Sequence, residues 1–117
     1  MADRPAHLHD PASVARARRH RLPEDVERLL RPLGDALCDP ARFRMLQALS
    51  EVNLSVKDLA AVVGRSETTA SQHLRLLRSV GAVESHRQGR RMVYALAGAG
   101  LGPAVQRVLG ALELLTS

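Results

Sequence analysis

A mainly α-helical fold with one small β-hairpin is predicted for this 117-residue chain by three observations. Apolar residues recur at helical spacing in several separate segments after Pro23, and most of these segments open on a capping residue. Two of the segments are separated only by Gly64 and Arg65. Two short alternating stretches, AVESH and RMVYAL, lie on either side of the turn sequence RQGR.

The composition is that of a single globular domain built largely from aliphatic side chains. Hydrophobic residues make up 45% of the chain, and its aromatic residues are Phe43 and Tyr94. So few aromatic rings argue against binding of single-stranded nucleic acid, which uses ring faces as stacking platforms. Cys38 is the single cysteine, which excludes an internal disulfide and favours a cytoplasmic location. No stretch approaches the ~18 consecutive apolar residues of a membrane span.

The positive charge is concentrated in two places. Residues 1–22 carry five arginines against two aspartates, and residues 65–91 carry six arginines against two glutamates, whereas residues 23–64 are net acidic. Such an uneven distribution is typical of a protein that binds a polyanion. Residues 1–22 contain few large apolar side chains and are predicted to form a flexible basic arm, with a short helix around Val14–Arg19. Residues 23–117 are predicted to form the domain.

The first two helices of the domain are predicted from their start signals. One begins at Pro23 with acidic residues in its first turn, and its apolar stripe consists of Val26, Leu29, Leu30 and Leu33. The other has Asp39 as its N-cap and Pro40 at its first helical position. Its buried face is expected to comprise Phe43, Leu46 and Leu49, beside Met45 and Ala48. Cys38 precedes this cap and is interpreted as a small core residue rather than a sensor thiol.

The next two helices form a predicted helix-turn-helix. Ser55 caps the first, whose inner side carries Val56, Leu59, Ala60 and Val63, and Gly64 ends it. Ser66 caps the second, which runs to about Val80 and stops at Gly81. A two-residue connection and a polar leading face on the second helix are typical of this motif. The hairpin that follows corresponds to a wing, so the sequence predicts a winged helix-turn-helix.

The two terminal helices are expected to form a dimer interface. The last helix has one apolar side, made of Leu101, Val105, Val108, Leu109, Leu112 and Leu115. Long exposed apolar stripes are usually buried, and a two-fold dimer would bury both and present two copies of the helix-turn-helix. Packing of both helices on their own subunit is the alternative. The interface is predicted to contain Val26, Leu29, Leu30, Leu33, Val105, Val108, Leu109 and Leu112.

The helix that opens at Ser66 is predicted to read double-stranded DNA. Its inward side carries Ala70, Leu74 and Leu77, with His73 and Leu76 at the edges, and the opposite side is polar. Residues near the start of such a helix reach base edges in the major groove, where Gln72 can pair with adenine. Glu67 can accept from a cytosine amino group or simply complement the helix dipole. The predicted DNA contacts are Arg65, Ser66, Glu67, Thr68, Thr69, Ser71, Gln72, Arg75, Arg78, Arg87, Arg90 and Arg91.

The arginines of this set are expected to contact phosphates, which position the protein without reading sequence. Arg65, Arg75 and Arg78 belong to the helix and its approach, and the other three flank the wing turn. Neighbours on a strand point to opposite faces, so the three wing arginines cannot all face DNA. Arg90 is favoured over Arg91.

With this order of elements, the sequence resembles the ArsR/SmtB family of bacterial winged-helix transcription regulators. The matching words are ALCDPARFRMLQAL at 36–49, LSVKDLAAVVGRSETTASQHLRLLRSVGAV at 54–83 and RQGRRMVYAL at 87–96. The resemblance implies a homodimer that binds an operator and, in many members, releases it when a metal ion binds. In the family's S-x-H-L signature, His73 is expected to make an internal hydrogen bond that orients the helix.

The metal sites of that family are absent from this sequence. Where soft-metal members carry a C-V-C word, this chain has Ser55, Val56 and Lys57, and its last helix offers only Glu113 as a ligand. The remaining donor residues are His7 and His9, His20 near the end of the arm, His86 on the wing and Cys38, and of these His7 and His9 could seed a weak nickel or zinc site. Solvated histidines are the alternative interpretation, so no metal ligand or cofactor is assigned.

The sequence therefore predicts a transcriptional regulator that binds a near-palindromic operator as a homodimer. An enzyme is not expected, because Ser71 and His73 lie two residues apart on a helix and cannot face each other. Two alternatives stay open: a regulator that responds to nickel or zinc through the arm histidines, and a DNA adaptor whose signal is sensed by a separate partner protein.

Overall fold

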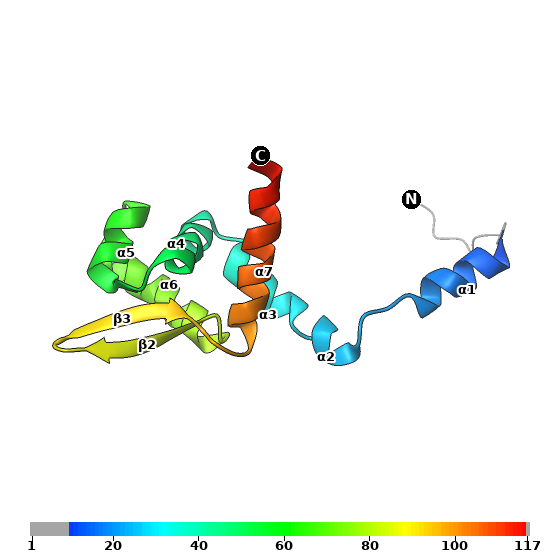
Figure 1. Ribbon diagram of the computed structural model, residues 1–117, viewed down its shortest axis with the longest axis horizontal. Helices are drawn as coiled ribbons and strands as arrows, with labels where there is room; N and C mark the ends of the chain where they lie inside the picture. Colours follow the sequence, from blue (N-terminus) through cyan, green and yellow to red (C-terminus); the bar gives the residue numbers. More distant parts are fainter. Residues whose placement is uncertain (1–9, 117) are drawn as a thin grey trace.

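The computed structural model describes residues 10–116 and has the predicted mainly helical architecture with a small sheet (Figure 1). The helices are α1 (Pro11–Arg19), α2 (Glu24–Glu27), α3 (Leu30–Leu37), α4 (Pro40–Glu51), α5 (Val56–Val63), α6 (Glu67–Ser79) and α7 (Leu101–Glu113). The strands are β1 (Leu54–Ser55), β2 (Val83–Gln88) and β3 (Arg91–Leu96), and a short 3₁₀ turn spans Leu114–Thr116. This order confirms the winged helix-turn-helix, with α5 and α6 as the motif and β2 and β3 as the wing.

The helix predicted from Pro23 is divided into α2 and α3 at Arg28 and Leu29. Pro32 explains the break, because in one continuous helix its ring would clash with the carbonyl group of Arg28 and it has no N–H to donate there. The Leu29 N–H instead bonds the Val26 carbonyl oxygen at 3.0 Å, which tightens the turn. The predicted apolar stripe is split as a result, with Leu29 and Leu33 packed on the core and Val26 and Leu30 exposed.

The sheet contains a third strand that the sequence did not predict. Its order is β1-β3-β2, all antiparallel, and Leu54 and Ser55 of β1 pair with Tyr94 and Val93 of β3. Two residues are too short to show an alternating pattern, which explains why β1 went undetected. The hairpin closes through Gly89 and Arg90, since Gln88 pairs with Arg91. Gly89 has a φ of 61°, as required at the first central position of a type II′ turn.

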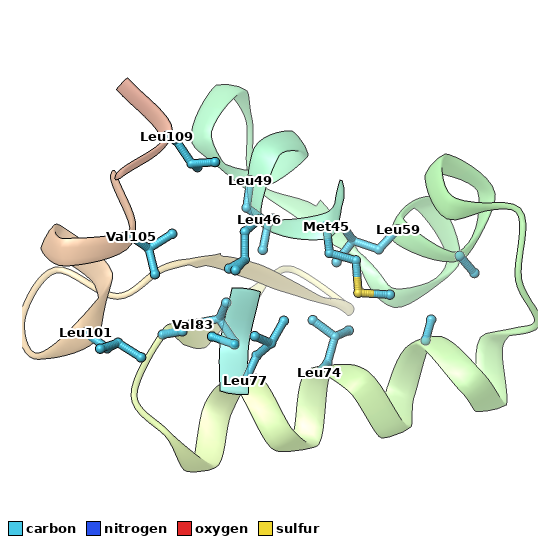
Figure 2. Close-up of a cluster of buried hydrophobic side chains, with 14 residues drawn as sticks. Met45, Leu46, Leu49, Leu59, Leu74, Leu77, Val83, Leu101, Val105 and Leu109 are labelled. Carbon is cyan, nitrogen blue, oxygen red and sulfur yellow. The ribbon is translucent and has the colours of Figure 1, made fainter. Parts of the chain in front are cut away.

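The core lies between α4, α5, α6, α7 and the base of the wing (Figure 2). Met45, Leu46, Leu59, Leu74, Leu77 and Val105 are its largest fully buried side chains. Leu46 and Leu49 are buried as expected and Met45 is fully buried with them, whereas Phe43 is only half-buried. The expectation of burial holds only in part for Phe43, which packs against the core and also lines a groove between α4 and α7.

Helix α7 packs on its own subunit more deeply than expected. Val105 is 0% exposed and Leu109 is 4% exposed, so these two residues of the predicted dimer interface already belong to the subunit core. Gly102 permits this packing, because a Cβ atom there would lie 1.8 Å from the Ala97 carbonyl oxygen. The outward positions of α7 include Leu112, which is 42% exposed.

Cys38 is exposed, so its interpretation as a core residue was wrong. It caps the C-terminus of α3, and its neighbour Ala36 points inward instead. The Cys38 Sγ atom faces polar groups, at 3.7 Å from both the Asp35 carbonyl oxygen and Arg42 Nη2. The turn between α3 and α4 thus directs the thiol away from the apolar interior.

The helix expected around Val14–Arg19 is present and begins earlier, at Pro11. Asp10 caps it, with its carboxylate accepting from the Ser13 N–H at 3.2 Å and the Ser13 hydroxyl at 2.6 Å. Helix α1 has no buried residue and stands apart from the other helices in Figure 1. Among residues 10–116, no helix is long and apolar enough to cross a membrane.

Candidate DNA-binding surface

Helix α6 is anchored by one side and leaves the other open to solvent. Ala70, Leu74 and Leu77 are at most 1% exposed and lie in the core beneath it (Figure 2). The opposite side presents Thr68, Ser71, Gln72, Arg75 and Arg78, all exposed. The predicted division of this helix into a buried and a polar face is therefore confirmed, and the polar face has a fixed orientation relative to the domain.

The start of α6 is held by a capped turn. Gly64 ends α5 in the left-handed conformation, with φ 66°, and the Arg65 N–H bonds the Ala60 carbonyl oxygen at 3.0 Å. Ser66 then caps α6, accepting from the Thr69 N–H at 3.1 Å. The Ser66 hydroxyl also donates to Thr69 Oγ1 at 3.1 Å, and Thr69 is half-buried. Thr69 and Ser66 are thus engaged with each other, whereas Thr68 remains open.

A polar contact joins α6 to the start of α4. The Arg42 guanidinium lies 3.5 Å from His73 Nδ1, and His73 Nε2 lies 3.9 Å from Asp39 Oδ2. A guanidinium can only donate, so a hydrogen bond between these two side chains has His73 Nδ1 as its acceptor. The contact agrees with the internal, orienting role expected for His73. The sequence alone did not identify Arg42 as the partner, since the two residues are 31 positions apart.

Asp39 itself is a charged helix cap. Its Oδ2 atom accepts from the Arg42 N–H at 3.0 Å. This hydrogen bond is the main cause that holds the pKa of the Asp39 carboxyl below its ordinary value of 3.8, with smaller contributions from the nearby His73 and Arg42 side chains and against an opposing effect of burial. The carboxylate is thereby kept charged at the end of α4 nearest to His73.

The wing arginines differ in their freedom to meet a ligand. Arg91 forms an ion pair with Asp58 of α5, with 3.0 Å between Arg91 Nη2 and Asp58 Oδ2. Arg87 pairs in register with Met92, and Met92 is the residue after Arg91 on the same strand. Because neighbouring residues of a strand point to opposite faces, Arg87 and Arg91 lie on opposite faces of the hairpin. Arg90 lies in the turn at the tip and is exposed. This arrangement supports the preference for Arg90 over Arg91.

The residues at the family's C-V-C position, Ser55, Val56 and Lys57, include a helix cap and an exposed cation. The Ser55 hydroxyl caps α5 by accepting from the Asp58 N–H at 3.2 Å, and Lys57 is exposed. His86 lies 2.9 Å from a carboxylate oxygen of Glu84 on the wing. Residues 10–116 contain no cluster of three or more His, Cys, Asp or Glu side chains able to hold a metal ion. His7 and His9, the proposed seeds of an arm site, lie outside the described residues.

A capped, outward-facing helix beside a basic wing defines the class of winged helix-turn-helix proteins, and comparisons with known proteins place the chain within it. A family model described as a helix-turn-helix domain matches residues 37–86. The regulator CmtR of Mycobacterium tuberculosis is 41% identical over 87 residues, which cover 71% of this chain and 74% of CmtR. The transcriptional repressor SmtB homolog of Synechocystis sp. is 47% identical over 62 residues, or 53% of this chain and about half, 47%, of that protein.

Solved structures agree with these sequence matches. A homodimeric winged helix-turn-helix DNA-binding domain from Mycobacterium bovis, described as a possible ArsR-family transcriptional regulator, superposes with a TM-score of 0.66 and 27% identity. The match covers 84% of this chain and 89% of that one. The transcriptional repressor BigR from Xylella fastidiosa gives a TM-score of 0.67 at 27% identity, with coverages of 83% and 98%. The chain belongs to the ArsR/SmtB family of DNA-binding transcriptional regulators.

Proposed function

We propose that the protein binds a near-palindromic operator as a homodimer and reads its sequence with the exposed side of α6. The observation that carries this proposal is the combination of a fully buried inner side with a polar outer side on one capped helix. A helix fixed in this way can present the same side chains to a major groove each time it docks. Two such helices in a symmetric pair would read half-sites about one helical turn, ~10 base pairs, apart or a multiple of it.

The side chains of α6 divide by chemistry into two groups. Thr68, Ser71 and Gln72 carry hydroxyl and amide groups that both donate and accept, so they suit base edges. Arg75 and Arg78 lie further along the same exposed side and suit phosphates, as does Arg65 before the cap. Glu67 is exposed in the first turn, where it complements the helix dipole and remains available to a cytosine amino group.

The dimer interface proposed from the structure is smaller than the one expected from the sequence. Leu29, Leu33, Val105 and Leu109 are occupied by contacts within the subunit. Val26 and Leu30, exposed by 42% and 72%, and Leu112, exposed by 42%, remain on the outer surfaces of α2, α3 and α7. Val108, one helical turn before Leu112 on α7, is half-buried. The exposure of these apolar side chains supports a homodimer in which a second copy covers them, as does the homodimeric state of the Mycobacterium bovis domain.

The direct test is a titration of the protein with the duplex upstream of its own coding sequence, against a scrambled duplex of equal length. Preferential binding at one dimer per site supports the proposal, and equal affinity for both duplexes contradicts it. The same titration with nickel or zinc separates the two alternatives. A metal-dependent change in affinity that is lost when His7 and His9 are replaced identifies the arm as the sensor. Indifference to both metals favours a signal that reaches the regulator through another protein.

A further inference from the structure

Helix α1 is basic, capped and without an apolar face of its own. Arg16, Arg18 and Arg19 lie in its last turn, and none of its residues is buried. Helices of fewer than ~12 residues are marginal in water unless tertiary contacts support them. The nine residues of α1 have an N-cap but no core contact to provide that support. A partner that stabilises such a helix would do so through electrostatic contacts with its arginines rather than through burial of apolar surface.

The arginines of α1 are available for such a partner. Among residues 10–116, ion pairs connect Arg21 to Glu27, Arg28 to Glu24 and Arg91 to Asp58, and none involves Arg16, Arg18 or Arg19. Ser13, Arg16 and Arg19 border one hollow together with His20, which places both guanidinium groups on one side of the helix. Like charges three residues apart repel each other, and an anion between them removes that repulsion.

We propose that α1 is a second DNA-binding element, in which Arg16 and Arg19 contact phosphates of the bound operator outside those met by α6 and the wing. The inference rests on the proposed function, since it requires an operator-bound dimer. Charge complementarity selects DNA as the occupant, because the duplex offers a dense array of phosphates and α1 has no apolar stripe for a protein surface or a bilayer. Contacts of this kind raise affinity without reading sequence.

A four-residue linker separates the arginines of α1 from the domain. Residues 20–23 connect it to α2 and span at most ~14 Å when extended, at about 3.5 Å per residue. Arg19 is the last residue of α1, and Arg16 lies about one turn before it, ~4.5 Å along the axis at about 1.5 Å per residue. The extended linker therefore lets both arginines meet the backbone several phosphates away from the domain, since successive phosphates of one strand are ~3.4 Å apart along the axis.

The test compares two full-length double variants with equal loss of charge. Arg16→Gln with Arg19→Gln removes the proposed contacts, and Arg31→Gln with Arg44→Gln removes two exposed arginines of α3 and α4 that form no ion pair in the described structure. Operator affinity is measured from ~50 to ~200 mM salt. The α1 variant is expected to flatten the plot of log affinity against log salt by roughly 1.8 units for each engaged arm, at ~0.9 unit per phosphate. Its base preference should match the wild type.

Three outcomes separate the explanations. Equal slopes for the two variants would overturn the proposal. A change in dimer dissociation of the α1 variant without DNA, measured by sedimentation, would also overturn it by assigning α1 to the second subunit. Failure of the wild-type protein to prefer its operator would instead refute the proposed function. A second experiment tests where α1 lies on the operator. An iron chelate is tethered to the new thiol of Arg19→Cys in a Cys38→Ser background, and cleavage of the operator backbone by this chelate supports the proposal.

Discussion

Helices α6 and α1 are both capped and both carry arginines, yet they stand in opposite relations to the rest of the molecule. Helix α6 fixes Ala70, Leu74 and Leu77 in the core, whereas α1 buries nothing. A base edge is recognised only by a side chain held at a defined position, while a phosphate can be met by any arginine that comes near. In the proposed complex, α6 therefore supplies specificity and α1 supplies affinity.

The largest expected effect separates the two helices by stability. Leu74→Ala should lower the free energy of unfolding by roughly 2–5 kcal/mol, because it leaves a cavity in a fully packed core. Val14→Ala on α1 should change it by less than about 0.5 kcal/mol, since no core contact is lost. Urea denaturation followed by circular dichroism measures both. Equal losses for the two variants would show that α1 belongs to the cooperative unit.

The next effect concerns specificity within α6. Gln72→Ala should relax the preference for one base pair of the operator by ~1–3 kcal/mol, because it removes a donor and acceptor from the groove. Arg75→Ala should weaken binding to all sequences alike and reduce the salt dependence by about one unit. A panel of operators with single base-pair changes measures both variants. If Gln72→Ala kept the base preference while Arg75→Ala altered it, the assigned roles would be wrong.

The two aspartate caps provide a smaller contrast. Asp39→Ala should lower stability by ~1 kcal/mol, the usual value of an N-cap, whereas Asp10→Ala should affect only α1. Thermal unfolding of the domain measures the first change, and circular dichroism of the folded protein measures the second. A matching shift in domain unfolding for Asp10→Ala would contradict the separation of α1 from the core.

Asp39 also gives a defined pH dependence. Its pKa is lowered below 3.8 in the folded protein, so its stabilising contribution is complete above the unfolded-state value and is lost as the pH falls through the lowered value. Asp39→Asn keeps an N-cap that does not titrate. The stability advantage of the wild type over Asp39→Asn should therefore shrink as denaturation is repeated from pH 6 toward pH 3. An advantage that grew with acidification would contradict the charged cap.

The smallest effect is expected at the wing. The Arg91–Asp58 pair is solvent-exposed, with side chains 64% and 50% accessible, so Asp58→Asn should cost less than about 1 kcal/mol. Arg90→Gln, at the exposed tip, should nevertheless weaken operator binding more than Arg91→Gln does. Fluorescence anisotropy with a labelled operator compares these two variants. A larger loss for Arg91→Gln would reverse the preference.

Local signals in the sequence predicted the capped helices and the polar side of α6, because caps and periodicity depend on near neighbours. These local signals failed where the burial of a side chain depends on packing between residues that are far apart in the sequence. The spacing of Val105 and Leu109 is the same whether their side of the helix faces the subunit core or a second copy. Their burial in the core depends on Gly102, which lets α7 lie close to the backbone of Ala97. Cys38 follows the apolar residues Ala36 and Leu37, yet the turn before α4 exposes it. Its contact with Arg42, like that of Arg91 with Asp58, depends on tertiary geometry.

The most direct test of the central claim follows the backbone amide resonances of the isotope-labelled protein during titration with the operator duplex. The polar side of α6 should meet the groove, so the largest shifts are expected at Thr68, Ser71, Gln72 and Arg75, with further shifts near Arg90. Amides of the buried side, such as Leu74, should shift less. Saturable binding that left the α6 amides unchanged, with all shifts on α7 or α3, would contradict the account.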